Sequence, residues 1–207
     1  NFPGTVKTTA TYKVLSNNTL DITFEATTDK ETVVNMTNHS YFNLNGDPSK
    51  EGTNMVLYVN ADNFTPADDT YMTTGEIKPV EGTPMDFRKP HAISETINDT
   101  TYQQIKNATG YDHNWCLNTY KNGKGDDTKV CASLYSPVTG ILLEMFTNEP
   151  GVQVYTGNFQ GTGIACKHGV KYPKHVSVCL ESQKYPDSPN KKDWPSPYLK
   201  PGERYYS

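Results

Sequence analysis

The feature that most restricts the fold is the regular alternation of side chains over residues 20–27. Apolar side chains stand at every second position with polar or charged ones between them, and the apolar set is Leu20, Ile22, Phe24 and Ala26. Because side chains on a strand point alternately to its two faces, the pattern predicts a strand with one solvent-facing side. Residues 5–15 also alternate, and the turn pair Asn17-Asn18 separates the two stretches. We therefore expect a β-hairpin here.

Further strand signals recur at short intervals along the 207 residues. Each is a run that contains β-branched or other apolar residues and is bounded by turn residues, and the runs are residues 33–44, 55–59, 111–117, 129–135, 141–147, 151–156 and 176–180. Only residues 93–105 have helical character, and Asn98-Asp99 interrupts them. Short strands with almost no helix indicate an antiparallel all-β sandwich or barrel. No shift in composition marks a boundary, so we expect residues 1–207 to be a single domain.

Charge, hydropathy and cysteine spacing bear on partners and compartment. A net charge of −4 gives no reason to expect nucleic acid or an anionic membrane as a partner. No apolar run approaches a membrane span in length. The cysteines are widely spaced, which favours reduced thiols in a cytoplasmic protein; they are Cys116, Cys131, Cys166 and Cys179. Asn-x-Ser/Thr triplets would be glycan acceptors in a secreted chain, so the compartment stays open.

Residues 33–44 carry a titratable group inside an apparent strand. They begin with Val33 and Val34 and continue with His39 among asparagine, threonine and serine. An imidazole donates or accepts a proton near neutral pH at little cost, so His39 is a candidate for proton transfer. The commoner alternative is a hydrogen-bonded structural histidine. No histidine has a metal-ligand spacing with another His, Cys or acidic residue, so we expect no metal site.

Two carboxylates are further candidates. Glu181 ends the apolar run 176–180, where a regular strand would place Ser177, Cys179 and Glu181 on one face. Partial desolvation there would raise the pKa of Glu181 and make it a better base near neutrality; the alternative is a strand-end glutamate that reaches solvent. Asp112 lies in the run Gly-Tyr-Asp-His-Asn, where a turn or capping aspartate is the alternative.

Four blocks in order along the chain resemble the aldose 1-epimerase (galactose mutarotase) family: residues 35–44, 110–114, 151–158 and 172–183. A closing Pro-x-Leu-x-Pro-Gly-Glu pattern at residues 197–203 matches as well. The resemblance covers essentially the whole chain. It implies an antiparallel β-supersandwich that interconverts the α and β anomers of free hexoses without a cofactor.

The resemblance also implies a role for each matching residue. Glu181 becomes the general base that takes the proton of the C1 hydroxyl, and His39 becomes the general acid that protonates the ring oxygen. Asp112 and Gln153 become contacts to the sugar. Opening a hemiacetal needs one group to remove a proton and another to deliver one, so this chemistry requires neither a metal nor a nucleophile.

Family members carry an Asn-Arg pair and a second active-site histidine in a portion that precedes anything resembling Asn1, and a last strand beyond Tyr206. We therefore expect the full protein to be longer, and residues 1–207 to leave sheet edges and part of the core exposed.

Two alternative functions remain open. A sugar-phosphate epimerase-like protein on the same fold would need clustered arginines, whereas the chain has only Arg88 and Arg204. A non-catalytic carbohydrate-binding sandwich would need no acid and base together.

Overall fold

The computed structural model describes residues 2–207. Its strands are β1 (Val6–Val14), β2 (Leu20–Thr28), β3 (Thr32–Val33), β4 (Val56–Val59), β5 (Asn63–Thr65), β6 (Lys78–Pro79), β7 (His91–Ala92), β8 (Asp112–Cys116), β9 (Tyr120–Lys121), β10 (Lys124–Gly125), β11 (Ala132–Tyr135), β12 (Leu142–Met145), β13 (Gly151–Tyr155), β14 (Cys179–Gln183), β15 (Tyr198–Leu199) and β16 (Tyr205–Tyr206). The described residues also contain one α-helix and three short 3-10 helices: α1 (Gln103–Ala108), η1 (Ile93–Glu95), η2 (Lys167–Gly169) and η3 (Ser188–Asn190). Among residues 2–207, no helix has both the length and the apolar character needed to cross a bilayer.

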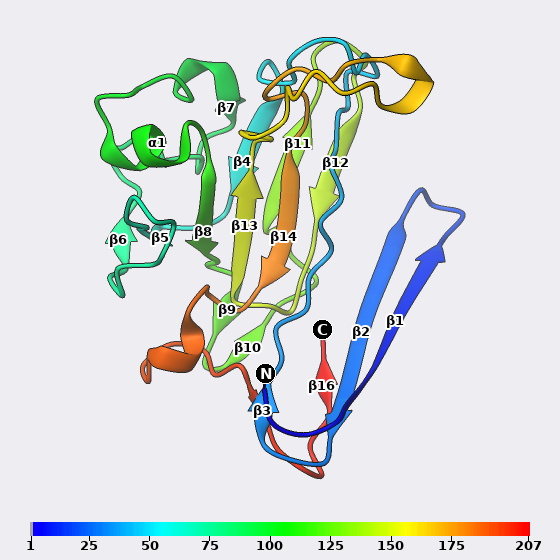
Figure 1. Ribbon diagram of the computed structural model, residues 1–207, viewed down its shortest axis with the longest axis vertical. Coiled ribbons are helices and arrows are strands. Elements are labelled where there is room, and N and C mark those ends of the chain that lie inside the picture. Colours follow the sequence, from blue (N-terminus) through cyan, green and yellow to red (C-terminus); the bar gives the residue numbers. More distant parts are fainter. Residues whose placement is uncertain (1) are drawn as a thin grey trace.

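Two antiparallel sheets share the main core of the molecule. The five-stranded sheet has the order β14-β13-β8-β5-β6, and the four-stranded sheet has the order β12-β11-β4-β7 (Figure 1). Buried side chains from both sheets join one apolar cluster, which includes Leu57, Phe64, Trp115, Leu134, Val154 and Leu180. Burial of apolar surface between sheets is the main stabilising force of such a sandwich. The predicted antiparallel all-β class is confirmed.

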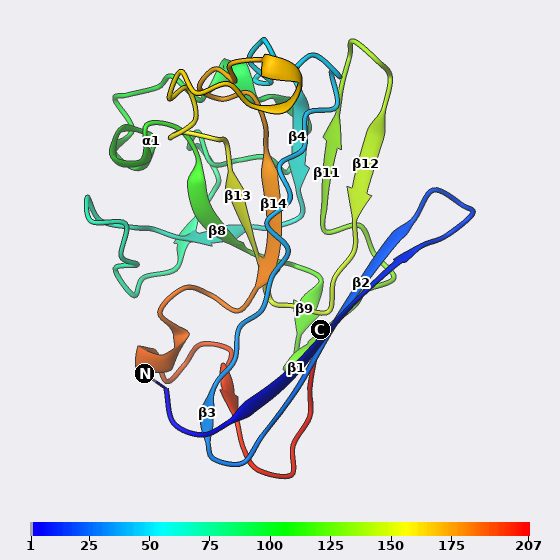
Figure 2. The same cartoon turned by 45° about the vertical axis from the view of Figure 1, so that its right-hand side comes forward.

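A third sheet, β1-β2-β16, carries the predicted hairpin. β1 and β2 pair from Val6 opposite Thr28 to Val14 opposite Leu20, and the hairpin extends away from the sandwich (Figures 1 and 2). Its base contributes Phe24 and Ala26 to a small second core, whose other members are Val34, Leu199 and Tyr205. The expectation of a single solvent-facing side is wrong for the outer half. Val14 is 86% exposed and Leu20 is 49% exposed, because the second core ends before it reaches them.

The strand predicted over residues 33–44 is largely wrong. Only Thr32–Val33 forms a strand, and Phe42 adds a single bridge to Val178. The side chain of Asn35 instead bonds the backbone of Lys184, accepting from its N–H at 2.9 Å and donating to its carbonyl at 3.1 Å. Such side-chain bonds to backbone compete with a regular ladder. Residues 34–44 therefore form an extended segment without a regular ladder, here called the strap, which runs alongside β14 (Figures 1 and 2).

The run 176–180 also differs from its prediction, because the strand begins at Cys179 and continues to Gln183. Val176 and Val178 are buried as their apolar character demands, although they precede the paired strand. Glu181 consequently lies in the middle of β14 and not at its end. The interrupted helix is confirmed as η1 followed by α1.

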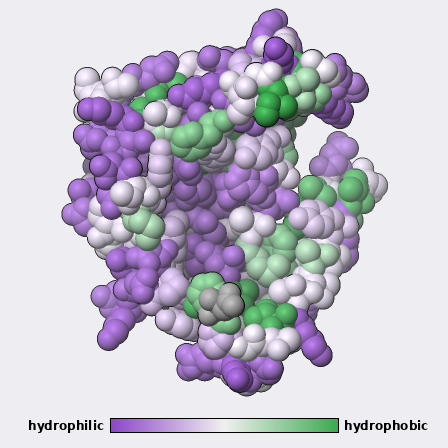
Figure 3. Space-filling model, in the orientation of Figure 1, coloured by the Kyte–Doolittle hydropathy of each residue, from purple (hydrophilic) through white to green (hydrophobic). Residues whose placement is uncertain are grey.

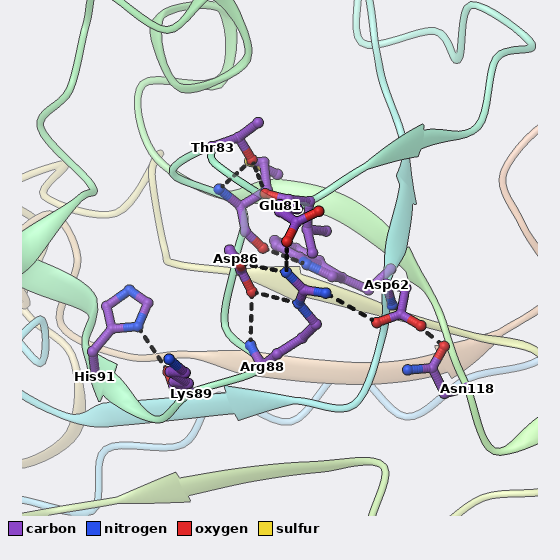
Figure 4. Close-up of polar contacts among 11 residues, drawn as sticks. Asp62, Glu81, Thr83, Asp86, Arg88, Lys89, His91 and Asn118 are labelled. Carbon is purple, nitrogen blue, oxygen red and sulfur yellow. Dashed lines mark hydrogen bonds and ion pairs between the residues drawn. The ribbon is translucent and has the colours of Figure 1, made fainter.

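The long loop between β5 and β7 is tied together by one arginine. Arg88 binds both oxygens of Asp86, with Nε at 2.9 Å from Oδ1 and Nη2 at 2.8 Å from Oδ2, and Nη1 lies 3.3 Å from Asp62 (Figure 4). Nη2 also lies 3.9 Å from Glu81. A planar guanidinium binds a carboxylate through two parallel hydrogen bonds, so the side chain of Arg88 stabilises this loop.

Candidate active site

Three adjacent strands present one polar face. Tyr155 on β13 pairs with Asp112 on β8 and with Cys179 on β14, and Gln153 pairs in the same way with Asn114 and Glu181. Laterally paired residues and residues two apart on a strand share a face. The intervening side chains point into the apolar core, and they include Trp115, Val152, Val154 and Leu180. The alternation thus places apolar side chains on the core face of these strands and polar side chains on the opposite face.

A cavity of about 370 Å³ lies on the polar face. Its lining residues are His39, Tyr41, Asp112, Gln153, Tyr155, Phe159, Glu181, Gln183 and Pro186. Figure 3 shows hydrophilic residues gathered in the hollowed centre of this side of the molecule. All four residues that the sequence singled out are therefore brought together.

A larger cavity of about 670 Å³ lies beside the β9–β10 hairpin. Its lining is polar and charged, and it includes the ion pair of Lys129 with Asp126 at 3.0 Å. It contains none of the candidate residues, so the smaller cavity is the candidate active site.

His39 and Glu181 are in contact within the lining of this cavity. Nε2 of His39 lies 3.3 Å from Oε1 of Glu181, and their side chains are 47% and 9% exposed. Burial raises the pKa of Glu181 to about 7, a change that nearby Asp112 reinforces and the charge of His39 opposes. A carboxylate with this pKa exchanges protons readily near neutral pH.

On both sides of His39, the strap is bonded to a residue that directly flanks β14. Asn35 bonds the backbone of Lys184 before it, and the backbones of Phe42 and Val178 exchange two hydrogen bonds after it, at 2.8 Å and 2.9 Å. Because both anchors are on the chain segment that carries Glu181, the imidazole is held above the carboxylate. Between these two anchors the imidazole ring is half exposed.

Asp112 is oriented by a chain of amides. Nε2 of Gln153 donates to Oδ1 of Asp112 at 2.8 Å, and Nε2 of Gln183 donates to Oε1 of Gln153 at 2.9 Å. The same nitrogen of Gln183 lies 3.2 Å from Oδ1 of Asn114. Burial raises the pKa of Asp112, whereas the bond from Gln153 acts in the opposite direction. The carboxylate is therefore presented to the cavity in a defined position.

The backbone just before Asp112 is clamped by two side chains. The N–H of Tyr111 donates to Oγ1 of Thr156 at 3.0 Å, and Nδ2 of Asn158 donates to the carbonyl of Tyr111 at 2.9 Å. Gly110 has a φ of +143°, and a Cβ there would collide with Asn158, so glycine is required. Residues 110–114 and 151–158 thus meet at one point and together set the start of β8.

Several lining residues were not predicted from the sequence. Tyr155 follows Gln153 by two positions and Gln183 follows Glu181 by two, so the strand period could have revealed both. Tyr41, Phe159 and Pro186 lie outside strands and give no such signal. The ring of Tyr41 lies 5.0 Å from that of His39, measured between centroids.

Neither arginine belongs to the cavity. Arg88 is held by the carboxylates of its own loop, and Arg204 pairs with Glu25 and lies over the ring of Tyr206. No lysine lines the cavity in the part of the chain that the structure describes.

One group of potential metal ligands does emerge, although sequence spacing indicated none. The donor atoms of His39, Cys179 and Glu181 all lie within 4.8 Å of one another. His39 is remote from the other two in the chain, so only the strap beside β14 brings the three together.

The fold and this cavity together place the molecule among the β-supersandwich proteins. The chain belongs to the aldose 1-epimerase family, whose model matches residues 1–207. It is 41% identical over 204 residues to galactose mutarotase of Mus musculus, covering 99% of this chain and 56% of that protein. It is 39% identical over 209 residues to aldose 1-epimerase of Escherichia coli, covering 100% of this chain and 58% of that protein.

Solved structures of epimerases have a fold similar to that of this chain. The aldose epimerase homologue of C. elegans superposes with a TM-score of 0.84 at 29% identity, covering 99% of this chain and 58% of that one. Galactose 1-epimerase of Lactobacillus acidophilus superposes with a TM-score of 0.80 at 29% identity, covering 100% of this chain and 56% of that one. The chain thus spans little more than half the length of the relatives it matches.

Proposed function

We propose that the protein is an aldose 1-epimerase, an isomerase that interconverts the α and β anomers of free hexoses such as galactose and glucose. The observation that carries the proposal is the 3.3 Å approach of His39 to Glu181 inside a polar cavity that also contains Asp112 and Gln153. Membership of the aldose 1-epimerase family and the names of its relatives support the same reaction.

In the proposed mechanism, Glu181 accepts the proton of the C1 hydroxyl while His39 delivers a proton to the ring oxygen. The bond between C1 and the ring oxygen breaks, and the aldehyde forms. Rotation about the C1–C2 bond turns the other face of the aldehyde toward the ring oxygen, and the two groups exchange roles as the ring closes. A carboxyl pKa of about 7 suits both directions, because neither protonation state of Glu181 is strongly favoured.

Asp112 and Gln153 are proposed to hold sugar hydroxyls. A buried carboxylate accepts hydroxyl protons strongly, and the amide chain behind it keeps it in place. Tyr41 and Tyr155 supply ring surfaces beside His39, which suits the apolar faces of a hexose.

Neutral sugars fit this cavity better than sugar phosphates. A phosphate would need a cation, and both arginines of the chain are bound elsewhere. A purely binding protein would need no imidazole opposite a carboxylate of raised pKa, so catalysis is favoured over binding alone. The wide spacing of the cysteines supports a cytoplasmic protein.

The test is polarimetry of freshly dissolved α-D-galactose with the purified protein. We expect the decay of optical rotation to accelerate, and to slow by about a hundredfold or more in both His39→Ala and Glu181→Gln, the usual worth of a general acid or base. His168→Ala and Glu144→Gln replace exposed residues outside the cavity and serve as controls that retain the wild-type rate. Folded wild-type protein without any acceleration, or wild-type rates in the two cavity variants, would contradict the proposal.

A further inference from the structure

Cys179 brings a thiol to the proton-transferring pair without lining the cavity itself. It is fully buried at the first position of β14, two residues before Glu181 on the same face of the strand. Its Sγ, an imidazole nitrogen of His39 and a carboxylate oxygen of Glu181 lie within 4.8 Å of one another. The proposed reaction does not use this thiol.

The three donors suit one kind of cation. Thiolate and imidazole ligands favour zinc, whereas magnesium and calcium favour oxygen ligands. Zinc bonds of about 2.0 to 2.3 Å in a tetrahedron hold their donor atoms roughly 3.5 Å apart. Nε2 of His39 and Oε1 of Glu181 are already 3.3 Å apart, and Sγ of Cys179 lies within 4.8 Å of donor atoms of both residues, so a small adjustment brings the three to this spacing. The ring of His39 is half exposed on the strap, which leaves room for that adjustment.

The charges also balance. A Zn²⁺ ion that binds neutral His39, the Glu181 carboxylate and the Cys179 thiolate forms a group with no net charge, which suits a buried site. The thiol must lose its proton to solvent as the ion binds, and a coordinating metal drives that loss. Asp112, on the same face, adds a negative charge that attracts the cation.

We propose that His39, Cys179 and Glu181 form a binding site for zinc and similar thiophilic divalent cations, and that occupation of this site inhibits the enzyme. The ion occupies the imidazole nitrogen and the carboxylate that proton transfer requires, and it stands where the sugar must enter. Inhibition is therefore competitive with the sugar. The inhibitory effect rests on the proposed mutarotase function, whereas the binding of the ion does not.

Cobalt serves as a spectroscopic substitute for zinc in the test. Titration of the purified protein with Co²⁺ should produce a near-ultraviolet thiolate-to-cobalt charge-transfer band that saturates at one equivalent, and Zn²⁺ should remove it. Cys179→Ala should abolish the band. Cys166→Ala, which removes an exposed thiol, should leave it unchanged. If Cys179→Ala loses its native circular dichroism, Cys179→Ser takes its place with the same expectation.

The second measurement is inhibition of mutarotation. At low sugar, zinc at ten times its dissociation constant should slow the wild-type enzyme roughly tenfold by mass action. Magnesium at the same concentration should have no effect, and Cys179→Ala should keep its activity with at least a tenfold weaker response to zinc. A cobalt band that survives in Cys179→Ala, or folded wild-type protein without a band, overturns the site. A normal band in a protein that never accelerates mutarotation would keep the site and reject the proposed function.

Discussion

The β1–β2 hairpin and the β13–β14 pair are both regular antiparallel ladders, yet they differ in what covers them. Nine residues of β1 pair with β2, and every residue of β1 except Thr11 is exposed. β13 is shorter, at five residues, and all of it except Gln153 is buried. Ladder length therefore says nothing about burial. A strand becomes a scaffold for chemistry only where neighbouring layers fix its side chains.

The comparison predicts that the two regions respond differently to substitution. Changes in the hairpin should affect stability according to their distance from the small second core. Changes on the polar face should affect proton transfer and binding, and can even stabilise the fold.

The largest effect on stability is expected at the base of the hairpin. Phe24 is buried in the second core, so Phe24→Ala should lower the free energy of unfolding by about 3 kcal/mol, the usual cost of an emptied phenylalanine site. Urea unfolding followed by circular dichroism measures this. The rate of mutarotation per folded molecule should stay the same. A loss below 0.5 kcal/mol would show that the second core contributes little.

Glu181→Gln should stabilise the protein above neutral pH while it removes activity. The folded state holds the Glu181 proton more tightly, with a pKa of about 7 against 4.5. In the wild type, the contribution of Glu181 to the free energy of unfolding is fully present below pH 4.5 and is lost as the pH rises through 7. The variant should therefore be more stable than the wild type by about 3 kcal/mol at pH 8 and equal to it at pH 4. Unfolding curves at both pH values decide, and a variant that is less stable at pH 8 would refute the desolvation argument.

Asp112→Ala should mainly weaken sugar binding. We expect KM to rise about tenfold with a smaller change in kcat, because a hydrogen bond to a charged group is lost and proton transfer is retained. Initial rates by polarimetry over a range of galactose concentrations give both constants. Asp126→Ala, beside the larger cavity, is the matched control and should change neither. A fall in kcat with unchanged KM would instead place Asp112 in the chemical step.

The smallest effect is expected at the tip of the hairpin. Val14 is almost fully exposed, so Val14→Thr should change the free energy of unfolding by less than about 0.5 kcal/mol. The same urea experiment measures it beside Phe24→Ala. A larger loss would mean that a surface not seen in residues 2–207 covers the tip.

The sequence predicted the elements whose local pattern agrees with their tertiary role. The alternation over residues 20–27 identified the strand, and the runs 151–156 and 111–117 identified β13 and β8 with small errors at their ends. Residues 33–44 were predicted as a strand because the apolar residues at their ends resemble one. In the structure, asparagine side chains make hydrogen bonds with backbone groups that strand pairing would otherwise use. Only the folded chain shows where Asn35 finds its partner.

The four candidate residues of the sequence share one cavity, but no local sequence pattern predicts that they lie together. His39 comes from the strap and Glu181 from β14, and their meeting depends on anchors formed between distant segments. The period of the strand predicted that Cys179 shares a face with Glu181, as the structure confirms, whereas its distance from His39 could not be predicted.

The amide chain behind Asp112 has a direction. Gln153 donates to the carboxylate and accepts from Gln183, so the dipoles of the two amides point the same way across two strands. Two aligned dipoles act as a fixed partial positive charge at Asp112, in the manner of the N-terminus of a helix, and they oppose the effect of burial on its charge. The sheet thereby keeps an acceptor of hydrogen bonds in the cavity without a lysine or an arginine beside it.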